Sequence, residues 1–234
     1  MRGASKQEGS VAFTALRLVK TGYFILSPGL VPDFELYCTS IQYKATMMSD
    51  SRPSDMITTP YVSTYLGNRF YPLVPCIDHV VIEDIAHGLA YQCRFNGQTH
   101  EFYSVAQHSL IVASMVPTDL RLAALLHDAA EAYLGDMVKP LKVLLPAFGA
   151  IEDQVSAIIA AAFGIDFSDY GPIKRADLIA LATEKRDLMP HSAERWAYLD
   201  DIRPLTEPIV TMSPGEAKQA FLTEFARLSA TTAR

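Results

Sequence analysis

The chain has 234 residues, of which 50% are hydrophobic and 20% are charged. This composition is typical of a packed globular protein and excludes a disordered or fibrous one. The formal net charge of −6 argues against a nucleic-acid polymer or an anionic membrane surface as partner, although it permits local cations around a small anionic ligand. We find no run of about 20 apolar residues, which a membrane-spanning helix would need.

The three cysteines are an odd number and form no CxxC pair. They predict neither a disulfide framework nor a thiolate zinc site. A reducing, cytoplasmic location is therefore the better interpretation.

Residues 1–60 are interpreted as an N-terminal extension and linker that is disordered or dispensable. The first twenty residues carry four basic side chains against one acidic side chain, as in an organelle transit peptide, but they lack the amphipathic repeat of one. Met47 and Met48 precede a polar, proline-bearing stretch at residues 49–60, which reads as a linker. The folded domain is expected to cover residues 61–234.

The first part of this domain combines β-branched and aromatic residues with turn signals. Residues 61–81 include Gly67-Asn68 and two prolines, a pattern that indicates short strands or a hairpin. Asp84 is placed to cap a helix over residues 84–93. The turn signal Asn96-Gly97 then places Arg94 where this helix gives way to a loop.

After residue 104 the apolar periodicity is helical. Ser104 is predicted to be an N-cap, and Gln107 three residues later would complete a capping box. Gly164 is predicted to end a later helix as its C-cap. The expected helices cover residues 104–116, a segment from 118 or 119 that continues through the His127-Asp128 pair, and residues 147–163, 173–188 and 214–228. The fold class is therefore a mostly α helical bundle with a small β element at its N-terminal side.

Four residues suggest a metal site: His108, the adjacent pair His127 and Asp128, and Asp177. Their separations of 19 and 49 residues are too long for one loop, so the site would assemble from separate helices of the bundle. The pair also follows the apolar run LRLAALL, where ionisable groups are costly unless they are paired, hydrogen-bonded or bound to metal. Two imidazoles and two carboxylates suit a divalent transition metal with open positions for water and substrate.

Further polar residues flank this set. Glu131 follows Asp128 by three residues and, on a continuing helix, would lie on nearly the same face. Asp136 adds a carboxylate in the turn beyond. Either could act as a base or position a water beside the metal. His79, His87 and His191 are interpreted as structural, whereas His100 lies between Arg94 and His108 and is a candidate for substrate contact.

Three stretches resemble the HD-domain phosphohydrolase superfamily: SVAQHS at residues 104–109, LLHDAAEAYLGDMVKPLK at 125–142 and KRADLIALATEKRD at 174–187. Within it they are most similar to the bacterial 5′-deoxynucleotidases and to prophage-type HD phosphohydrolases. The similarity extends from about residue 67 to residue 187. It implies an HD-domain helical bundle with one divalent transition metal ion (Mn, Co, Fe, Zn or similar), held by His108, His127, Asp128 and Asp177.

The resemblance also implies roles for neighbouring residues. Glu131 would assist the attacking water, Asp136 would lie by the scissile phosphate or the sugar, and Arg94 would grip phosphate. From its position after Asp136, Lys139 could, together with Lys142, add positive charge at the entrance to the phosphate-binding site. The alternative is that the two lysines lie on a solvated helix start. The charge run at residues 184–187 is interpreted as a solvated face, from which Arg186 could reach a partner subunit or the substrate.

The expected function is metal-dependent hydrolysis of a nucleotide, with a 5′-deoxynucleotidase acting on deoxynucleoside monophosphates preferred. A deoxynucleoside triphosphate triphosphohydrolase and a non-catalytic nucleotide-binding HD protein remain open. A dinuclear HD oxygenase would need more histidines at ligand spacing. The Walker, GxGxxG and GxSxG motifs are absent from the sequence. The apolar last helix and the N-terminal extension favour a homo-oligomer.

Overall fold

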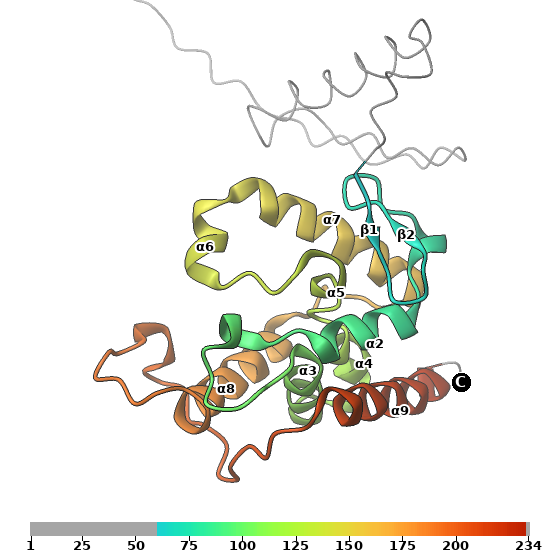
Figure 1. Cartoon of the computed structure of the whole chain (residues 1–234). Coiled ribbons are helices and arrows are strands. Elements are labelled where there is room, and N and C mark those ends of the chain that lie inside the picture. The colour runs from blue at the N-terminus through green and yellow to red at the C-terminus, as the bar shows by residue number, and fades with distance from the viewer. Residues whose placement is uncertain (1–59, 233–234) are drawn as a thin grey trace, which may run out of the picture. The chain divides into compact units, whose positions relative to one another are not determined.

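The computed structural model describes residues 60–232, so the expectations for the N-terminal extension lie outside the described residues. These residues are mostly helical, with one small antiparallel sheet, and the predicted fold class is confirmed (Figure 1). The strands are β1 (Val62–Ser63) and β2 (Arg69–Phe70). The α-helices are α2 (Ile82–Tyr91), α3 (Val105–Met115), α4 (Arg121–Leu125), α5 (Glu131–Leu134), α6 (Lys139–Leu144), α7 (Pro146–Phe163), α8 (Gly171–Asp187) and α9 (Pro214–Thr232).

The short hairpin forms where the sequence predicts it. Gly67 takes a φ of +81° in the turn, a conformation that glycine adopts without steric cost. Phe70 is fully buried and stacks on Tyr133 of α5, with ring centroids 3.8 Å apart. Asp84 is not the cap of α2, because the helix begins two residues earlier. Its carboxylate accepts a hydrogen bond from the backbone of Leu66 and so ties α2 to the hairpin.

Helix α3 lies at the centre of the helical packing and contacts α2, α4, α8 and α9. Four of its apolar residues are buried: Val105, Ala106, Val112 and Ala113. The apolar face of α9, which the sequence assigned to contact with a second copy, packs against helices of its own chain through Ala217 and Phe221. Oligomerisation stays a prediction.

The predicted caps are confirmed in part. The Ser104 hydroxyl accepts a hydrogen bond from the Gln107 backbone at 3.1 Å, so Ser104 is the N-cap of α3. The other half of the capping box is wrong. The Gln107 side chain instead donates to the Val210 carbonyl at 2.7 Å and accepts from the Met212 backbone at 2.8 Å. It thereby fastens the segment before α9. Gly164 ends α7 in the left-handed conformation, as predicted.

The His127-Asp128 pair does not lie on a continuous helix, which corrects the sequence-based expectation. Helix α4 ends at Leu125, and residues 126–130 form turns before α5 begins. In these turns the Glu131 backbone donates to the Asp128 carbonyl at 3.0 Å. Residues three apart are eclipsed in such tight turns. Asp128 and Glu131 therefore still share one side of the chain.

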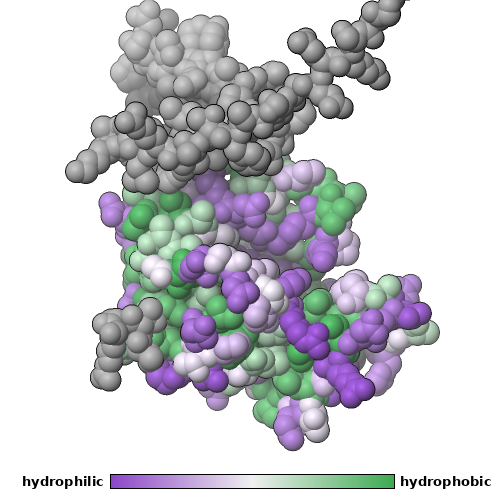
Figure 2. Space-filling view, turned by 180° about the vertical axis from the view of Figure 1, so that it is seen from behind, coloured by the Kyte–Doolittle hydropathy of each residue, from purple (hydrophilic) through white to green (hydrophobic). Residues whose placement is uncertain are grey.

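The surface of one face mixes hydrophilic and hydrophobic residues (Figure 2). Among the described helices, none combines the length and the apolar character needed to cross a bilayer.

Candidate metal centre

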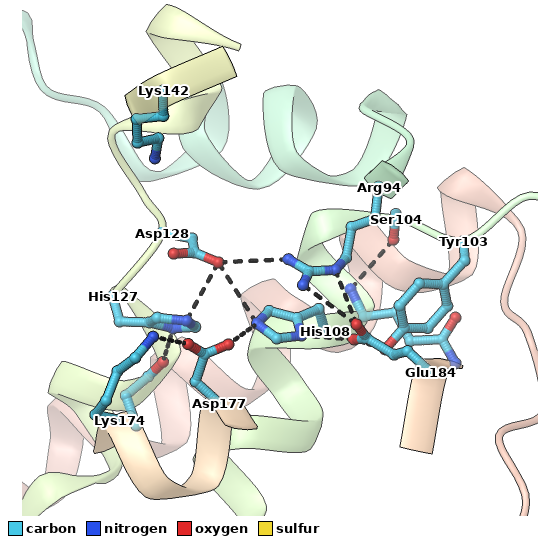
Figure 3. A network of polar contacts seen from close by, with 12 residues as sticks. Arg94, Tyr103, Ser104, His108, His127, Asp128, Lys142, Lys174, Asp177 and Glu184 are labelled. Carbon is cyan, nitrogen blue, oxygen red and sulfur yellow. Dashed lines mark hydrogen bonds and ion pairs between the residues drawn. The ribbon is translucent and has the colours of Figure 1, made fainter. Parts of the chain in front are cut away.

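His108, His127, Asp128 and Asp177 come together from α3, the turn after α4, and α8 (Figure 3). His108, His127 and Asp177 each offer one ligand atom. These atoms all lie within 4.8 Å of one another and could hold a metal ion. His108 Nε2 lies 3.4 Å from Asp177 Oδ1, and Asp128 Oδ2 lies 3.5 Å from His108 Nε2 and 3.2 Å from His127 Nε2. Ligand bonds of about 2.1 Å put neighbouring ligand atoms roughly 3.0–3.4 Å apart, so these contacts suit one shared ion.

Both imidazole rings are held by the nitrogen that faces away from the cluster. Nδ1 of His108 lies 2.6 Å from Oε1 of Glu184, and Nδ1 of His127 lies 2.8 Å from the Ala124 carbonyl. Each Nδ1 must therefore donate, because both partners are acceptors. The two Nε2 atoms are buried and have no hydrogen-bond partner among the described residues. Rings oriented in this way are typical of metal-binding histidines.

The charged groups of the cluster shift one another's pKa values toward the ionised forms. Burial alone would raise the pKa of Asp128, but His127, His108 and Arg94 hold it well below its usual range. For Asp177, burial is likewise outweighed, chiefly by the close contact with His108 at 3.4 Å and its charge. Burial and Arg94 lower the pKa of His108, but Glu184 and Asp177 outweigh them and raise it to about 9. Without a metal, the cluster therefore holds a proton on His108 between ionised carboxylates.

Glu184 corrects the interpretation of residues 184–187 as a solvated face. Its side chain is fully buried and accepts hydrogen bonds from His108, from the Tyr103 hydroxyl at 3.0 Å and from Arg94 Nε at 3.3 Å. Burial would raise its pKa, but Arg94 and His108 lower it below the usual value. Arg186 does lie on the outside, where it pairs with Asp187.

Arg94 lies beside the cluster, as the sequence predicts, and its side chain is only 11% exposed. One edge of the guanidinium faces Glu184, with Nη2 3.2 Å from Oε2, and Nη1 lies 3.7 Å from Asp128 Oδ2. The next two residues, Phe95 and Asn96, have φ values of +55° and +51°. Asparagine tolerates this left-handed conformation, but it is unusual for a bulky residue such as Phe95, and unusual backbone conformations cluster at functional sites.

Glu131 is buried at the start of α5. Burial, reinforced by the negative charges of Asp128 and Asp136, raises its pKa well above the usual value. Burial also raises the pKa of Asp136, against the lowering effect of Arg94. Lys142 points toward the cluster in Figure 3, and its ammonium lies 2.7 Å from Glu152. Glu131 and Asp136 therefore both lie close enough to Asp128 and Arg94 for these charges to shift their pKa values.

Two predicted substrate contacts, Lys139 and His100, have described interactions with residues outside the cluster. Lys139 is exposed at the start of α6, with Nζ 5.6 Å from the ring centre of Tyr198. His100 is exposed, and its backbone donates to the Leu188 carbonyl at 2.9 Å. Of the histidines interpreted as structural, His87 stacks between Tyr65 and Tyr91.

Comparison with known proteins identifies a relative in Escherichia coli strain K12, the uncharacterized protein YfdR. It is 40% identical over 171 residues, which cover 72% of this chain and 96% of YfdR. The chain belongs to the YfdR family. The uncharacterized protein RCAP_rcc00048 of Rhodobacter capsulatus is 42% identical over 120 residues, covering 47% of this chain and 61% of that protein. No family model matches the chain.

In this member of the YfdR family, sequence reasoning missed Glu184 as part of the site. A helical signal was nevertheless present. Asp177 and Glu184 are seven residues apart, and residues two turns apart lie on the same face of a helix. A helix that directs Asp177 toward the cluster therefore directs Glu184 toward the same side.

Proposed function

We propose that this chain is a metal-dependent phosphohydrolase of the HD-domain type that releases phosphate from deoxynucleoside monophosphates. The proposal is carried by the convergence of His108, His127 and Asp177, whose two imidazoles each present a buried Nε2 without a described hydrogen-bond partner. Each Nε2 instead faces carboxylate oxygens 3.2–3.5 Å away without a well-aligned hydrogen bond, an arrangement that is costly to bury unless an ion or a proton is shared between them. Binding of a metal ion would supply the shared ion.

The donor set fits the proposed ion. Imidazole nitrogens with carboxylate oxygens suit Mn²⁺, Co²⁺, Fe²⁺ or Zn²⁺. With Asp128 as the fourth ligand, two carboxylates balance the two charges of the ion. An ion held there supplies Lewis-acid polarisation of a phosphoryl oxygen and lowers the pKa of a water.

Glu131 is proposed to take the proton of the attacking water. It lies one tight turn after Asp128, and its Oε2 has no hydrogen-bond partner among the described residues. Its raised pKa means that it binds a proton more readily than an exposed glutamate does. These properties suit a general base.

Arg94 is proposed to balance the charge that develops on the phosphoryl group. Burial would lower the pKa of its guanidinium, but Glu184 and Asp128 raise it above the usual value, so the group stays charged. The edge that faces Asp128 is not fixed by the two bonds to Glu184. That edge can donate to a phosphate oxygen, and a preorganised donor of this kind stabilises the transition state.

The nucleotide substrate is inferred from the resemblance to the 5′-deoxynucleotidases. A phosphate monoester carries at most two negative charges, which Arg94 and a divalent ion can offset between them. Lys142, which lies above Asp128 and points toward it in Figure 3, would add a further positive charge beside the phosphate. Asp136 is proposed to lie by the sugar or the scissile phosphate.

The test uses the full-length protein, stripped of metal and reloaded separately with each of the four ions. A panel of deoxynucleoside and ribonucleoside monophosphates and deoxynucleoside triphosphates is then assayed for released phosphate and triphosphate. We expect phosphate release from deoxynucleoside monophosphates. Release of triphosphate alone would overturn the proposed substrate in favour of a triphosphohydrolase. Release of neither product by metal-bound protein would overturn hydrolysis in favour of a nucleotide-binding protein.

The role of Glu131 is tested by Glu131→Gln, which keeps the shape of the side chain but removes the base. We expect kcat to fall by about 100- to 10,000-fold while the metal content stays the same. The matched control is Glu83→Gln, at an exposed position of α2, which should keep wild-type kcat. Unchanged kcat in Glu131→Gln would contradict the assignment.

A further inference from the structure

We infer that Glu184 is a positioning residue that holds both His108 and Arg94, so that the metal site and the phosphate-binding arginine are built on one carboxylate. The part that concerns Arg94 rests on the proposed function, whereas the part that concerns His108 requires only metal binding. Glu184 itself does not lie among the proposed ligands.

The contacts of Glu184 divide between its two oxygens (Figure 3). Oε1 accepts from His108 Nδ1 at 2.6 Å and from the Tyr103 hydroxyl at 3.0 Å. Oε2 accepts from Arg94 through Nη2 at 3.2 Å and Nε at 3.3 Å. The partners lie 76 to 90 residues away in sequence. One buried side chain of α8 therefore joins three distant residues.

A fully buried carboxylate is an expensive choice for packing alone. Its ionised form must be compensated by charges and hydrogen bonds, and an apolar side chain of similar size carries no such cost. Two of the three compensating partners, His108 and Arg94, also face the cluster. The arrangement thus orients a metal ligand and a phosphate-binding group together.

The bond to His108 determines which nitrogen faces the cluster. Because Nδ1 donates to Glu184, Nε2 is directed toward Asp128 and Asp177. A carboxylate in this position also makes the ring a more basic ligand. Loss of its charge should therefore weaken metal binding, even though Glu184 contacts no ion.

The bond to Arg94 has a second consequence. A second carboxylate near the guanidinium belongs to Asp128, a proposed ligand, at 3.7 Å. Without the charge of Glu184, Arg94 would be drawn to Asp128 and would compete with the metal for it. The same change would remove the support that holds Arg94 for phosphate. Loss of the Glu184 charge should therefore lower both the affinity for the metal and the affinity for phosphate.

The experiment is a titration of the metal-free, full-length protein with Mn²⁺, comparing the wild type with Glu184→Gln. We expect the affinity to fall by about 10- to 100-fold, the range for partners that support a metal ligand. The matched control is Asp187→Asn on the same helix, whose carboxylate contacts Arg186 and the backbone of Ile209. It should bind Mn²⁺ within about twofold of the wild type. Equal affinity for Glu184→Gln would overturn the inference.

If Glu184→Gln does not fold because Arg94 has lost its partner, a second pair of variants answers the question. Arg94→Met alone is compared with Arg94→Met combined with Glu184→Gln, in which both charges of the buried pair are removed. The double variant should bind Mn²⁺ about tenfold more weakly than the single variant, because His108 has lost its carboxylate. Equal affinities would show that Glu184 does not position His108.

Inorganic phosphate, titrated into protein saturated with Mn²⁺, tests the part that concerns Arg94. Its affinity should fall in Glu184→Gln by a factor similar to that in Arg94→Met, and an unchanged affinity would contradict that part. The outcomes separate the two proposals. Weakened Mn²⁺ binding in Glu184→Gln without hydrolysis of any nucleotide by the wild type would leave the positioning of His108 intact and refute the proposed function. Nucleotide hydrolysis by the wild type with unchanged Mn²⁺ binding in Glu184→Gln would support the proposed function and refute the positioning of His108.

Discussion

Raising the pH from 6.5 to 8.5 should tighten metal binding by roughly 80-fold, because His108 must lose a proton before Nε2 can bind an ion. The pKa of this imidazole is raised to about 9, chiefly by Glu184 and Asp177 against the effects of burial and Arg94. Below that pKa the unprotonated fraction falls about tenfold for each pH unit. Asp128 has a pKa well below this window and stays ionised throughout it.

The assay is calorimetric titration of the metal-free protein with Mn²⁺ at several pH values, corrected for binding of metal by the buffer. Repeating the titration at pH 7 in two buffers with different protonation enthalpies gives the number of protons released. We expect about one proton per ion from His108, with any proton lost by Glu131 adding to it. An affinity that changes less than threefold across the window, with no proton released, would refute the reasoning.

The same proton links pH to the stability of the metal-free protein. The folded pKa of His108 lies above its unfolded value of about 6.5, so its contribution is complete below pH 6.5 and is lost as the pH rises through 9. The difference corresponds to about 3 kcal/mol. The raised pKa of Glu131 acts in the same direction. Urea unfolding of the metal-free protein should therefore show lower stability at pH 9 than at pH 6.5, and equal stability would contradict the linkage.

Four further substitutions have expected outcomes. Asp177→Asn should weaken Mn²⁺ binding by more than about 100-fold. Lys174→Met, which removes a partly exposed partner of Asp177, should change the affinity by less than about fivefold. Similar effects of the two substitutions in a metal titration would contradict the assignment of Asp177 as a ligand. Gly88→Ala should lower the free energy of unfolding by about 1–3 kcal/mol, because a methyl group there would lie 2.9 Å from Ala132; an unchanged urea midpoint would show that α2 and α5 can separate. Gln107→Ala should lower the free energy of unfolding by about 1–3 kcal/mol, because two backbone groups before α9 lose their hydrogen-bond partner. Unchanged proteolysis of that segment would contradict the role of Gln107 in holding it.

Local signals in the sequence were sufficient for much of the fold. The Ser104 cap, the Gly164 terminator and the hairpin around Gly67 all depend on residues within a few positions of each other. Helical periodicity after residue 104 was strong enough to give the correct fold class. These features could be predicted because their energetics are local.

The turn that carries His127 and Asp128 could not be predicted in the same way. Leu125 and Leu126 continue the apolar run of α4, and Ala129 and Ala130 are good helix formers, so no residue marks the break. The helix nevertheless ends at Leu125. Tertiary packing therefore overrides local propensity at this point, which is expected where a site must direct side chains inward.

Glu184 was missed for a related reason. Its neighbours Lys185, Arg186 and Asp187 are charged and partly exposed, as on an ordinary solvated helix end. The partners that bury Glu184 come from other elements of the fold and leave no mark in the adjacent sequence. His108, His127 and Asp177 were predictable because of their residue types and the motif around them, which do not depend on knowing those contacts.

We propose that a metal ion held by His108, His127, Asp128 and Asp177 enables the chain to hydrolyse a nucleotide. The most direct measurement is phosphate release from a deoxynucleoside monophosphate by the full-length protein, before and after removal of metal and again after Mn²⁺ is restored, beside Asp128→Ala. We expect activity to be lost on removal of the metal, to return with Mn²⁺ and to be absent from Asp128→Ala. Full activity of the metal-free wild type, or of Asp128→Ala, would contradict it.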